Sequence, residues 1–365
     1  MLSSQTEYRK ADHIKISLKE DVQAKQITTG FENVHFVHQA LPEIDRDSIH
    51  LATKVFSHEF SAPIFVGAMT GGTKEATKIN KFIAEAVEDL GLGMGVGSQR
   101  AAIEEPKLES TYRIVRKMAP KAFLVANIGA PQLVQGYGVK EAKRAVEMIE
   151  ADALAIHLNP LQEAIQPEGE ANYAGVLQKI EEITETLRVP VIVKETGAGM
   201  SAEAAKKLEG AGVNGIDVSG AGGTSWAAVE YYRAKIAKDK FRQRLGESFW
   251  DWGIPTVASL VEVTQTTKLP VIASGGVRTG TDVTKALALG ASLASMSTPI
   301  LYPATQSTRE VKSALNFFIE ELRNTMFLIG VDSVEKLKRT PVIMLGKTAE
   351  WLEKRGFKPE EYARR

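Results

Sequence analysis

Eight short apolar runs, each followed by a longer polar or amphipathic stretch, recur along this sequence about every 33 residues, the length of one βα unit. The runs are residues 62–69, 92–98, 122–128, 153–158, 189–195, 213–219, 269–275 and 291–297. Continuous apolar strands that alternate with helices form a parallel sheet covered on both faces, and eight such units close naturally. We therefore predict an α/β fold, a TIM (β/α)8 barrel. A doubly wound open sheet is the alternative, but the first unit carries no dinucleotide fingerprint.

Residues 1–60 precede the first predicted strand and do not follow the repeat. Their strand signals, at 34–41 and 49–56, are weak. We therefore expect an N-terminal extension that caps the barrel rather than a further βα unit.

The pattern changes again in the second half of the chain. Residues 224–254 lengthen the connection after the sixth strand, and long insertions of this kind often form lids or subunit contacts. An amphipathic stretch at 308–330 is expected to be the helix that closes the eighth unit. We thus predict a barrel over 61–330 and a helical tail over 331–365.

Composition excludes several classes of protein. The 365 residues contain no cysteine, which excludes disulfide scaffolds, thiolate catalysis and cysteine–zinc sites. With 45 basic and 45 acidic side chains, the net charge is zero, so we expect no nucleic-acid partner. No apolar run is long enough to cross a membrane. The N-terminal segment, which contains Glu7, Arg9 and Lys10, does not have the pattern of a signal peptide. We expect a soluble, cytoplasmic protein.

Glycine-rich segments follow the sixth and seventh predicted strands, as GAGGTS (220–225) and SGGVRTG (274–280). In a TIM barrel the active site is built from the loops after the strands, and phosphate often binds near the last of them. Backbone N–H groups and Arg278 would bind such a phosphate. Tight βα turns alone would explain any one of these loops, but several successive units favour a phosphate-bearing ligand.

Two polar residues end otherwise apolar strands. Lys194 closes the fifth, where an unpaired charge would be costly, so it should meet an anion or an electron-rich ring. A Schiff-base lysine is the alternative role. Asn127 closes the third strand and suits the edge of a heteroaromatic ring, or it simply caps a turn.

The loop after the fourth strand is the most distinctive. It carries His157, Asn159, Gln162, Glu163, Glu168 and Glu170. Oxygen ligands without cysteine indicate Mg²⁺, which commonly binds one or two carboxylates together with substrate phosphates. The alternative is a solvated acidic loop that leads into the next helix.

A basic set lies apart from the glycine loops. It consists of Arg9, Lys10, His13 and Arg100. One phosphate does not need all of these, so they indicate a second anionic group, unless they are ordinary surface cations.

Taken together, the motifs resemble one family. RKADHI (9–14), AMTGG (68–72), GSQR (97–100), HLNPLQE with PEGE (157–170), DVSGAGGTSW (217–226) and SGGVRTG (274–280) are similar to the type 2, FMN-dependent isopentenyl-diphosphate delta-isomerases. The resemblance covers almost the whole chain and includes the RTPVIMLGKTAEWL tail. The family pattern reads PEGD where this chain has Glu170, which is a conservative change.

The resemblance implies an enzyme of isoprenoid biosynthesis that interconverts isopentenyl and dimethylallyl diphosphate by a 1,3-proton shift. It implies reduced FMN, with NAD(P)H as the reductant, and Mg²⁺ on the diphosphate. A carbocation-like state would be stabilised electrostatically beneath the electron-rich flavin. A homotetramer or larger homo-oligomer is also implied, and the N-terminal extension would contribute to the substrate site.

The resemblance also assigns roles to residues. Binding of FMN is implied for Ala68, Met69, Thr70, Ser98, Asn127, Lys194, Ser219, Thr224, Gly275, Gly276, Arg278, Ala294 and Ser295. Binding of substrate is implied for Arg9, Lys10, His13, Ser98, Gln99, Arg100, His157, Asn159 and Gln162. Glu163 would bind the metal, and Gln162 and Glu230 would be catalytic.

Two other functions are compatible with parts of the pattern. Flavin barrels that oxidise 2-hydroxy acids resemble the phosphate end, but they use a histidine base late in the barrel, and no histidine follows His157. A module that only stores flavin or binds isoprenoid diphosphate would not need the loop around Glu163.

Overall fold

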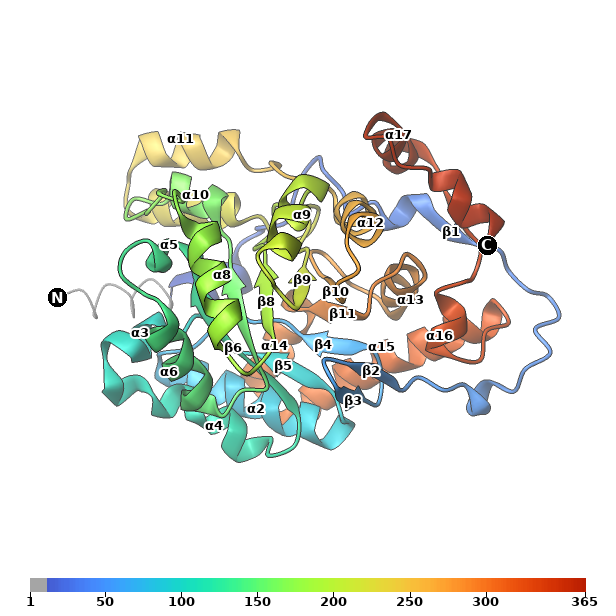
Figure 1. The fold of residues 1–365 in the computed structure, drawn as a ribbon, viewed down its shortest axis with the longest axis horizontal. Helices are drawn as coiled ribbons and strands as arrows, with labels where there is room; N and C mark the ends of the chain where they lie inside the picture. Colours follow the sequence, from blue (N-terminus) through green and yellow to red (C-terminus); the bar gives the residue numbers. More distant parts are fainter. Residues whose placement is uncertain (1–11) are drawn as a thin grey trace.

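In the computed structural model, which describes residues 12–365, eight parallel strands close into a barrel in the order β10-β11-β4-β5-β6-β7-β8-β9 (Figure 1). The strands are β4 (Ile64–Val66), β5 (Gly93–Gly95), β6 (Phe123–Gly129), β7 (Ala153–His157), β8 (Val191–Lys194), β9 (Gly215–Asp217), β10 (Val271–Ala273) and β11 (Leu293–Met296). Each coincides with one of the eight predicted runs, and only β6 extends beyond its run, by one residue at Gly129. The TIM barrel is therefore confirmed, and the open sheet is wrong.

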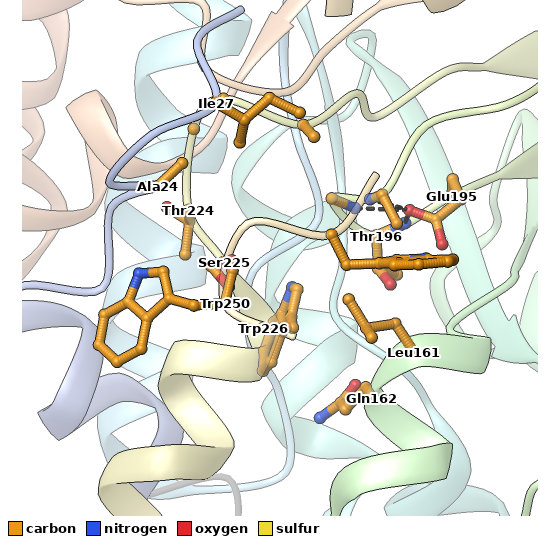
Figure 2. A pocket seen from close by; sticks show the side chains of 16 residues that line it. Ala24, Ile27, Leu161, Gln162, Glu195, Thr196, Thr224, Ser225, Trp226 and Trp250 are labelled. Carbon is orange, nitrogen blue, oxygen red and sulfur yellow. Dashed lines mark hydrogen bonds between the residues drawn. The ribbon is translucent and has the colours of Figure 1, made fainter. Parts of the chain in front are cut away.

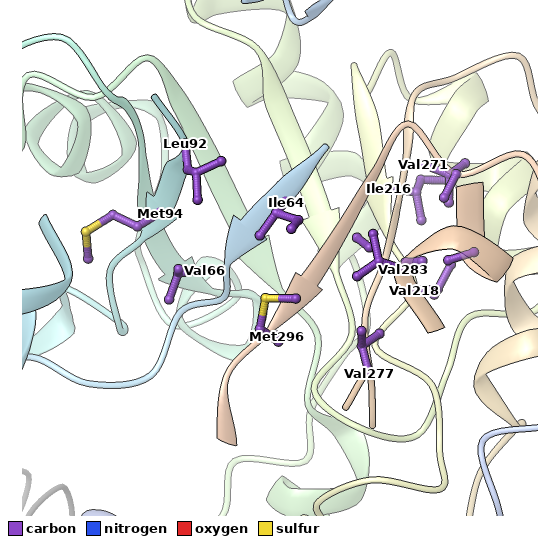
Figure 3. Close-up of a cluster of buried hydrophobic side chains, with 14 of the residues drawn as sticks. Ile64, Val66, Leu92, Met94, Ile216, Val218, Val271, Val277, Val283 and Met296 are labelled. Carbon is purple, nitrogen blue, oxygen red and sulfur yellow. The ribbon is translucent and has the colours of Figure 1, made fainter. Parts of the chain in front are cut away.

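The strands are apolar on both faces because each separates the barrel interior from the surrounding helices. In β8, Ile192 packs inside the barrel, whereas Val191 and Val193 pack in the outer layer. Figure 3 shows part of that outer layer, where Ile64 and Met296 come from neighbouring strands. Because side chains alternate along a strand, the side chain of Lys194 points into the barrel, as that of Ile192 does.

Helices surround the barrel and connect successive strands (Figure 1). They are α2 (Lys74–Leu90), α3 (Arg100–Glu104), α4 (Ser110–Met118), α5 (Ala130–Leu133), α6 (Val139–Ile149), α7 (Pro160–Ile165), α8 (Val176–Thr186), α9 (Ala202–Gly210), α12 (Thr256–Thr266), α13 (Gly280–Ala288), α14 (Thr298–Gln306) and α15 (Thr308–Leu328), with a 3-10 turn η3 (Pro106–Leu108). In α2, Ile79, Ile83 and Val87 are buried at helical spacing. This helix begins at the Thr73 cap and ends at Gly91, whose φ of 62° suits glycine.

The hairpin of β2 (Thr53–Val55) and β3 (His58–Phe60) caps the barrel at the amino ends of its strands. The rings of Phe56 and Phe60 lie 5.9 and 5.5 Å from that of Phe123, the first residue of β6. Phe60 is fully buried. The capping role that was expected of residues 1–60 is thus carried at this end of the barrel by the hairpin.

Residues 22–29 cross the opposite end of the barrel as an extended strap. Val22 accepts a hydrogen bond from the backbone of Ser225, and Ala24 donates one to Gly223. The insertion after β9 holds the strap: Asp251 Oδ1 accepts from the backbone N–H groups of Lys25, Gln26 and Ile27 at 2.7–3.4 Å. The insertion forms α10 (Trp226–Ile236) and α11 (Lys240–Ser248), which pack together (Figure 1).

The tail packs back against the N-terminal region. Strand β12 (Val342–Met344) pairs antiparallel with β1 (Val34–Phe36), outside the barrel. The remaining elements are η1 (Phe31–Asn33), η2 (Arg46–Ser48), α16 (Val334–Leu337), α17 (Gly346–Lys354) and η4 (Pro359–Arg364). Within residues 12–365, none of the helices has the length and apolar character needed to span a bilayer.

Candidate active site

A cavity of about 270 Å³ opens at the carboxyl ends of the barrel strands. Met69 and Thr70 follow β4, Ser98 follows β5, and His157 and Lys194 are the last residues of β7 and β8. His13, Ile14 and Ser17, from a helical segment at 12–19, line the cavity from the N-terminal side. Residues far apart in the sequence thus meet around one cavity, as expected for the active-site end of a TIM barrel.

Most of the predicted site residues line this cavity. They are His13, Ala68, Met69, Thr70, Ser98, Arg100, Asn127, His157, Asn159, Gln162, Glu163, Lys194, Ser219, Thr224, Gly275, Gly276, Arg278 and Ser295. Glu230 lies behind this lining, and Arg9 and Lys10 lie outside the described residues.

Two of the predicted site residues, Ala294 and Gln99, have side chains that do not line the cavity. Ala294 packs in the outer layer, because its neighbour Ser295 takes the inward position on β11. Gln99 is fully buried: its Nε2 donates to the carbonyl of Ala145 at 2.8 Å, and its Oε1 accepts from the N–H of Asn127 at 2.8 Å. Neither side chain therefore lines the cavity, so a contact of Ala294 or Gln99 with a ligand would involve the backbone, and the Gln99 side chain supports the strand that carries Asn127.

The glycine-rich end of the cavity is suited to an anion. Gly275 and Gly276 have φ values of 97° and 70°, and a Cβ at Gly275 would lie 2.1 Å from the carbonyl oxygen of Gly220. Arg278 lines the cavity beside them and donates from Nη2 to Gln23 of the strap at 2.6 Å. Only glycine fits this backbone, which lines the cavity next to a guanidinium.

Lys194 and Asp217 face each other across neighbouring strands at the floor of the cavity. They are register partners in β8 and β9, and both line the cavity. Lys194 Nζ donates to the carbonyl of Glu195 at 2.6 Å, and Asp217 accepts from the hydroxyl of Ser274. Burial raises the pKa of Asp217, while the positive charge of Lys194 acts in the opposite direction. The lysine therefore brings a positive charge to the inner end of the cavity.

Asn127 orients His157 through a hydrogen bond. Its Nδ2 donates to the carbonyl of Val96 at 3.0 Å, so its Oδ1 faces His157 Nδ1 at 2.8 Å. Because Oδ1 is an acceptor, this arrangement assigns the proton to Nδ1. These contacts, with Val96 and His157, are not those of a residue that simply caps a turn.

The loop after β7 is organised around the buried carboxylate of Glu163. Oε1 accepts from Asn159 Nδ2 at 2.8 Å, and Oε2 accepts from Gln166 Nε2 and from the N–H of Glu170, both at 2.7 Å. Tyr173 in turn donates its hydroxyl to Asn159 Oδ1 at 3.0 Å. Since Glu163 is only 8% exposed and faces the cavity, the alternative of a solvated acidic loop does not hold for this residue.

Glu230, on α10, lies behind Gln162 and is 1% exposed. Its Oε1 accepts from Gln162 Nε2 at 3.0 Å and contacts His13 Nε2 at 3.2 Å, and its Oε2 accepts from Arg233 at 2.6 Å. Burial favours the neutral acid, but the hydrogen bond and charge of His13, with Arg233 and Gln162, lower the pKa of Glu230 to about 2. Glu230 is therefore a carboxylate at neutral pH, coupled to the cavity through Gln162.

A smaller pocket adjoins the cavity and shares Gln162, Thr224 and Trp226 with it (Figure 2). Glu195 lies in its wall. One oxygen of this carboxylate accepts from three consecutive backbone N–H groups, those of residues 196–198, at 2.5–2.7 Å. Burial raises the pKa of Glu195 to about 7 in spite of these hydrogen bonds. Glu195 thus shapes the loop that follows β8.

Two buried polar atoms at the cavity lack a hydrogen-bond partner within the described part of the chain, which fits a site that is filled by water or by a ligand. Thr70 Oγ1 and Gln166 Oε1 have no hydrogen-bond partner among residues 12–365, and both residues line the cavity. Buried polar atoms are rarely left in this state without water or a ligand. Within the same residues, no group of three His, Cys, Asp or Glu side chains could hold a metal ion alone. This donor set fits Mg²⁺ that is shared with a phosphate, and does not fit an all-protein zinc site.

Sequence reasoning missed several cavity residues. They include Gln132, Gln166, Asp217, Trp226, Ser274 and Thr298. Asp217 had a usable signal, since it is a charged residue near the end of a predicted apolar strand, two residues before Ser219. Gln166 lies three residues after Glu163, one helical turn away, and this spacing would have found it.

A model of the FMN-dependent dehydrogenase family matches residues 111–344. The isopentenyl-diphosphate delta-isomerase of Pyrococcus furiosus is 51% identical over 360 residues, covering 96% of this chain and 90% of that protein. The enzyme of the same name from Methanothermobacter thermautotrophicus is 49% identical over 357 residues, covering 98% and 99%. This chain belongs to the isopentenyl-diphosphate delta-isomerase family.

Solved structures of more distant proteins share the fold. Mandelate oxidase has a TM-score of 0.61 at 18% identity, covering 94% of this isopentenyl-diphosphate delta-isomerase homologue and 98% of that chain. A flavocytochrome b2 mutant with pyruvate bound has a TM-score of 0.65 at 18% identity, covering 90% and 82%. At this identity the likeness concerns the barrel alone.

Proposed function

We propose that this protein interconverts isopentenyl diphosphate and dimethylallyl diphosphate over reduced FMN, with Mg²⁺ on the diphosphate. The observation that carries the proposal is that Lys194 and Glu163 line one cavity. The cavity therefore contains both the positive charge of Lys194, for the flavin, and the carboxylate of Glu163, for the metal. The sequence similarity to named isomerases supplies the substrate pair.

The cavity divides into a cofactor side and a substrate side. FMN would be held by Ala68, Met69, Thr70, Ser98, Asn127, Lys194, Ser219, Thr224 and Ser295, with its phosphate at Gly275, Gly276 and Arg278. The partnerless hydroxyl of Thr70 supports this assignment. Bound reduced FMN supplies an electron-rich ring and, by resemblance to the family, a proton at N5.

The substrate diphosphate belongs at the other side of the cavity. His13, Ser98, Arg100, His157, Asn159 and Gln162 would bind it there, with Glu163 on Mg²⁺. Arg9 and Lys10 belong to the same proposal, because they precede the cavity-lining His13 closely in the sequence. We therefore also propose that residues 1–60 form an extension that contributes to the substrate site, followed by the barrel at 61–330 and the tail at 331–365.

Gln162 and Glu230 are proposed to act on the proton that leaves the substrate. A C–H bond next to a tertiary cationic carbon is strongly acidic, so even a carboxylate with a pKa of about 2 can draw its proton away. Gln162 cannot titrate, but its Nε2 connects the cavity to Glu230. The buried negative charge also favours positive charge in the cavity.

NAD(P)H is the proposed reductant, and a homotetramer or larger homo-oligomer is the proposed assembly. Light scattering on the purified, FMN-loaded protein measures the assembly directly. A monomer at all concentrations would contradict that part of the proposal.

The function is tested by an anaerobic assay with isopentenyl diphosphate. We expect conversion only when FMN, reductant and Mg²⁺ are all present. Full turnover with oxidised flavin, under strict exclusion of reductant, would contradict the proposal.

Glu163→Gln separates an enzyme from a module that only binds flavin or isoprenoid diphosphate. We expect the variant to keep FMN and to lose Mg²⁺-dependent turnover, because the metal loses its only proposed protein carboxylate. Unchanged affinity for the diphosphate in the presence of Mg²⁺ would favour the binding module.

A further inference from the structure

We propose that Gln166 belongs to the metal site, where its Oε1 accepts a hydrogen bond from a water bound to Mg²⁺ and its Nε2 fixes Glu163. The inference rests on the proposed function, because it assumes the metal at Glu163. It adds a second protein group that holds the hydrated ion.

The orientation of the Gln166 amide is set by its neighbour. Nε2 donates to Glu163 Oε2 at 2.7 Å, and the carboxylate can only accept, so the amide nitrogen faces Glu163. Oε1 therefore points away from the carboxylate. Gln166 is 2% exposed, lines the cavity, and its Oε1 has no partner among residues 12–365. A buried acceptor without a partner in the described residues thus belongs to a residue of the cavity lining, beside the proposed metal ligand.

The chemistry of this acceptor selects its partner. A diphosphate carries only acceptor oxygens at neutral pH and cannot donate to Oε1. Mg²⁺ keeps several of its waters when it binds proteins, and each of these waters donates hydrogen bonds. A hydrated ion at Glu163 therefore supplies the donor that Oε1 lacks.

The chain holds Gln166 firmly in place. It caps the carboxyl end of α7, with its N–H donating to the carbonyl of Gln162 at 2.9 Å. Arg242, on α11 of the insertion, donates from Nη1 to the carbonyls of Ile165 and Gln166 at 2.8 and 2.9 Å. The amide is thus placed before any ion arrives, as expected for groups that orient metal ligands.

A purely structural role would be to brace Glu163 through Nε2 alone. Gln166→Leu removes both ends of the amide, whereas Gln166→Glu replaces the donor and retains an oxygen at the cavity. If Gln166 only braces Glu163, both variants weaken metal binding, because the second carboxylate repels the first. If Oε1 faces the ion, the added negative charge compensates in Gln166→Glu.

The test measures Mn²⁺ binding to the FMN-loaded protein with inorganic pyrophosphate, from the electron paramagnetic resonance signal of free Mn²⁺. We expect Gln166→Leu to raise the Kd about 10- to 100-fold, the usual effect of losing an outer-shell partner. We expect Gln166→Glu to bind Mn²⁺ at least as tightly as the unchanged protein. Gln178→Leu, the same change on the exposed face of α8, should leave the Kd unchanged.

Glu163→Gln separates failure of this inference from failure of the proposed function. If Glu163→Gln weakens Mn²⁺ binding while Gln166→Leu matches the unchanged protein, the inference is wrong and the metal site stands. Equal weakening by Gln166→Leu and Gln166→Glu also overturns it, in favour of the bracing role. If Glu163→Gln has no effect on Mn²⁺ binding, the metal site itself is wrong.

Discussion

The alternation of side chains along two strands decides which residues reach the cavity. On β8, Ile192 and Lys194 point inward, which places the ammonium group at the cavity floor. On β11, Ser295 points inward and Ala294 outward, although the two are neighbours within the same predicted strand. The sequence was enough to locate the strand ends. It was not enough to predict which side chains of β11 point into the barrel, because both faces of this strand carry small or apolar side chains.

Lys194→Ala should weaken FMN binding about 10- to 100-fold, because the flavin loses a hydrogen bond to a charged group. Fluorescence quenching of FMN by the apoprotein measures the Kd. Lys206→Ala, an exposed change on α9, is the matched control. Retention of unchanged FMN affinity in Lys194→Ala would remove Lys194 from the site.

Glu195 should make the free energy of unfolding depend on pH. Its pKa rises from the usual 4.5 to about 7 in the folded protein, so between these values the folded state holds a proton that the unfolded state releases. This contribution is present below pH 4.5 and is lost as the pH rises through 7. Urea unfolding at pH 5 and pH 8 should show a fall on the order of 2 kcal/mol that Glu195→Gln reduces. An identical fall in the variant would contradict the raised pKa.

At the scale of elements, the local sequence pattern predicts the individual strands and helices. All eight strands and the helix at 308–330 arise from apolar periodicity and were predicted. The pairing of β1 with β12 joins residues about 300 positions apart and follows no local signal. The strap at 22–29 is similar, since its position depends on Asp251 and on glycines near Thr224. Its own sequence shows no periodicity.

The β2–β3 hairpin should contribute to stability and not to ligand binding, because it lies at the end of the barrel opposite the cavity. Phe60→Ala should lower the free energy of unfolding by about 3–5 kcal/mol, the usual effect of removing a fully buried aromatic ring. The Kd for FMN should stay unchanged. If Phe60→Ala does not fold, Phe60→Leu applies the same test with a smaller loss. Weaker FMN binding at unchanged stability would contradict this division of roles.

Across the whole molecule, the barrel and most of the candidate site could be predicted, for two different reasons. The repeat of strands and helices predicts the barrel, and the barrel brings every strand end to one rim. The assignment of ligands came from motifs such as HLNPLQE and SGGVRTG, because spacing alone indicates anions and a hard metal without naming a substrate. The spacing of Gln166 from Glu163 and the place of Asp217 near a strand end point to the site, but the contacts that define their roles form only in the folded chain.

Deuterium exchange under anaerobic conditions tests the central claim most directly. The FMN-loaded protein, reduced and supplied with Mg²⁺, is incubated with isopentenyl diphosphate in D₂O, and both isomers are analysed by mass spectrometry. We predict deuterium in both isomers, with none when the flavin is oxidised or Mg²⁺ is removed. Conversion without uptake of deuterium, or equal uptake with oxidised flavin, would contradict a proton shift carried out in this cavity.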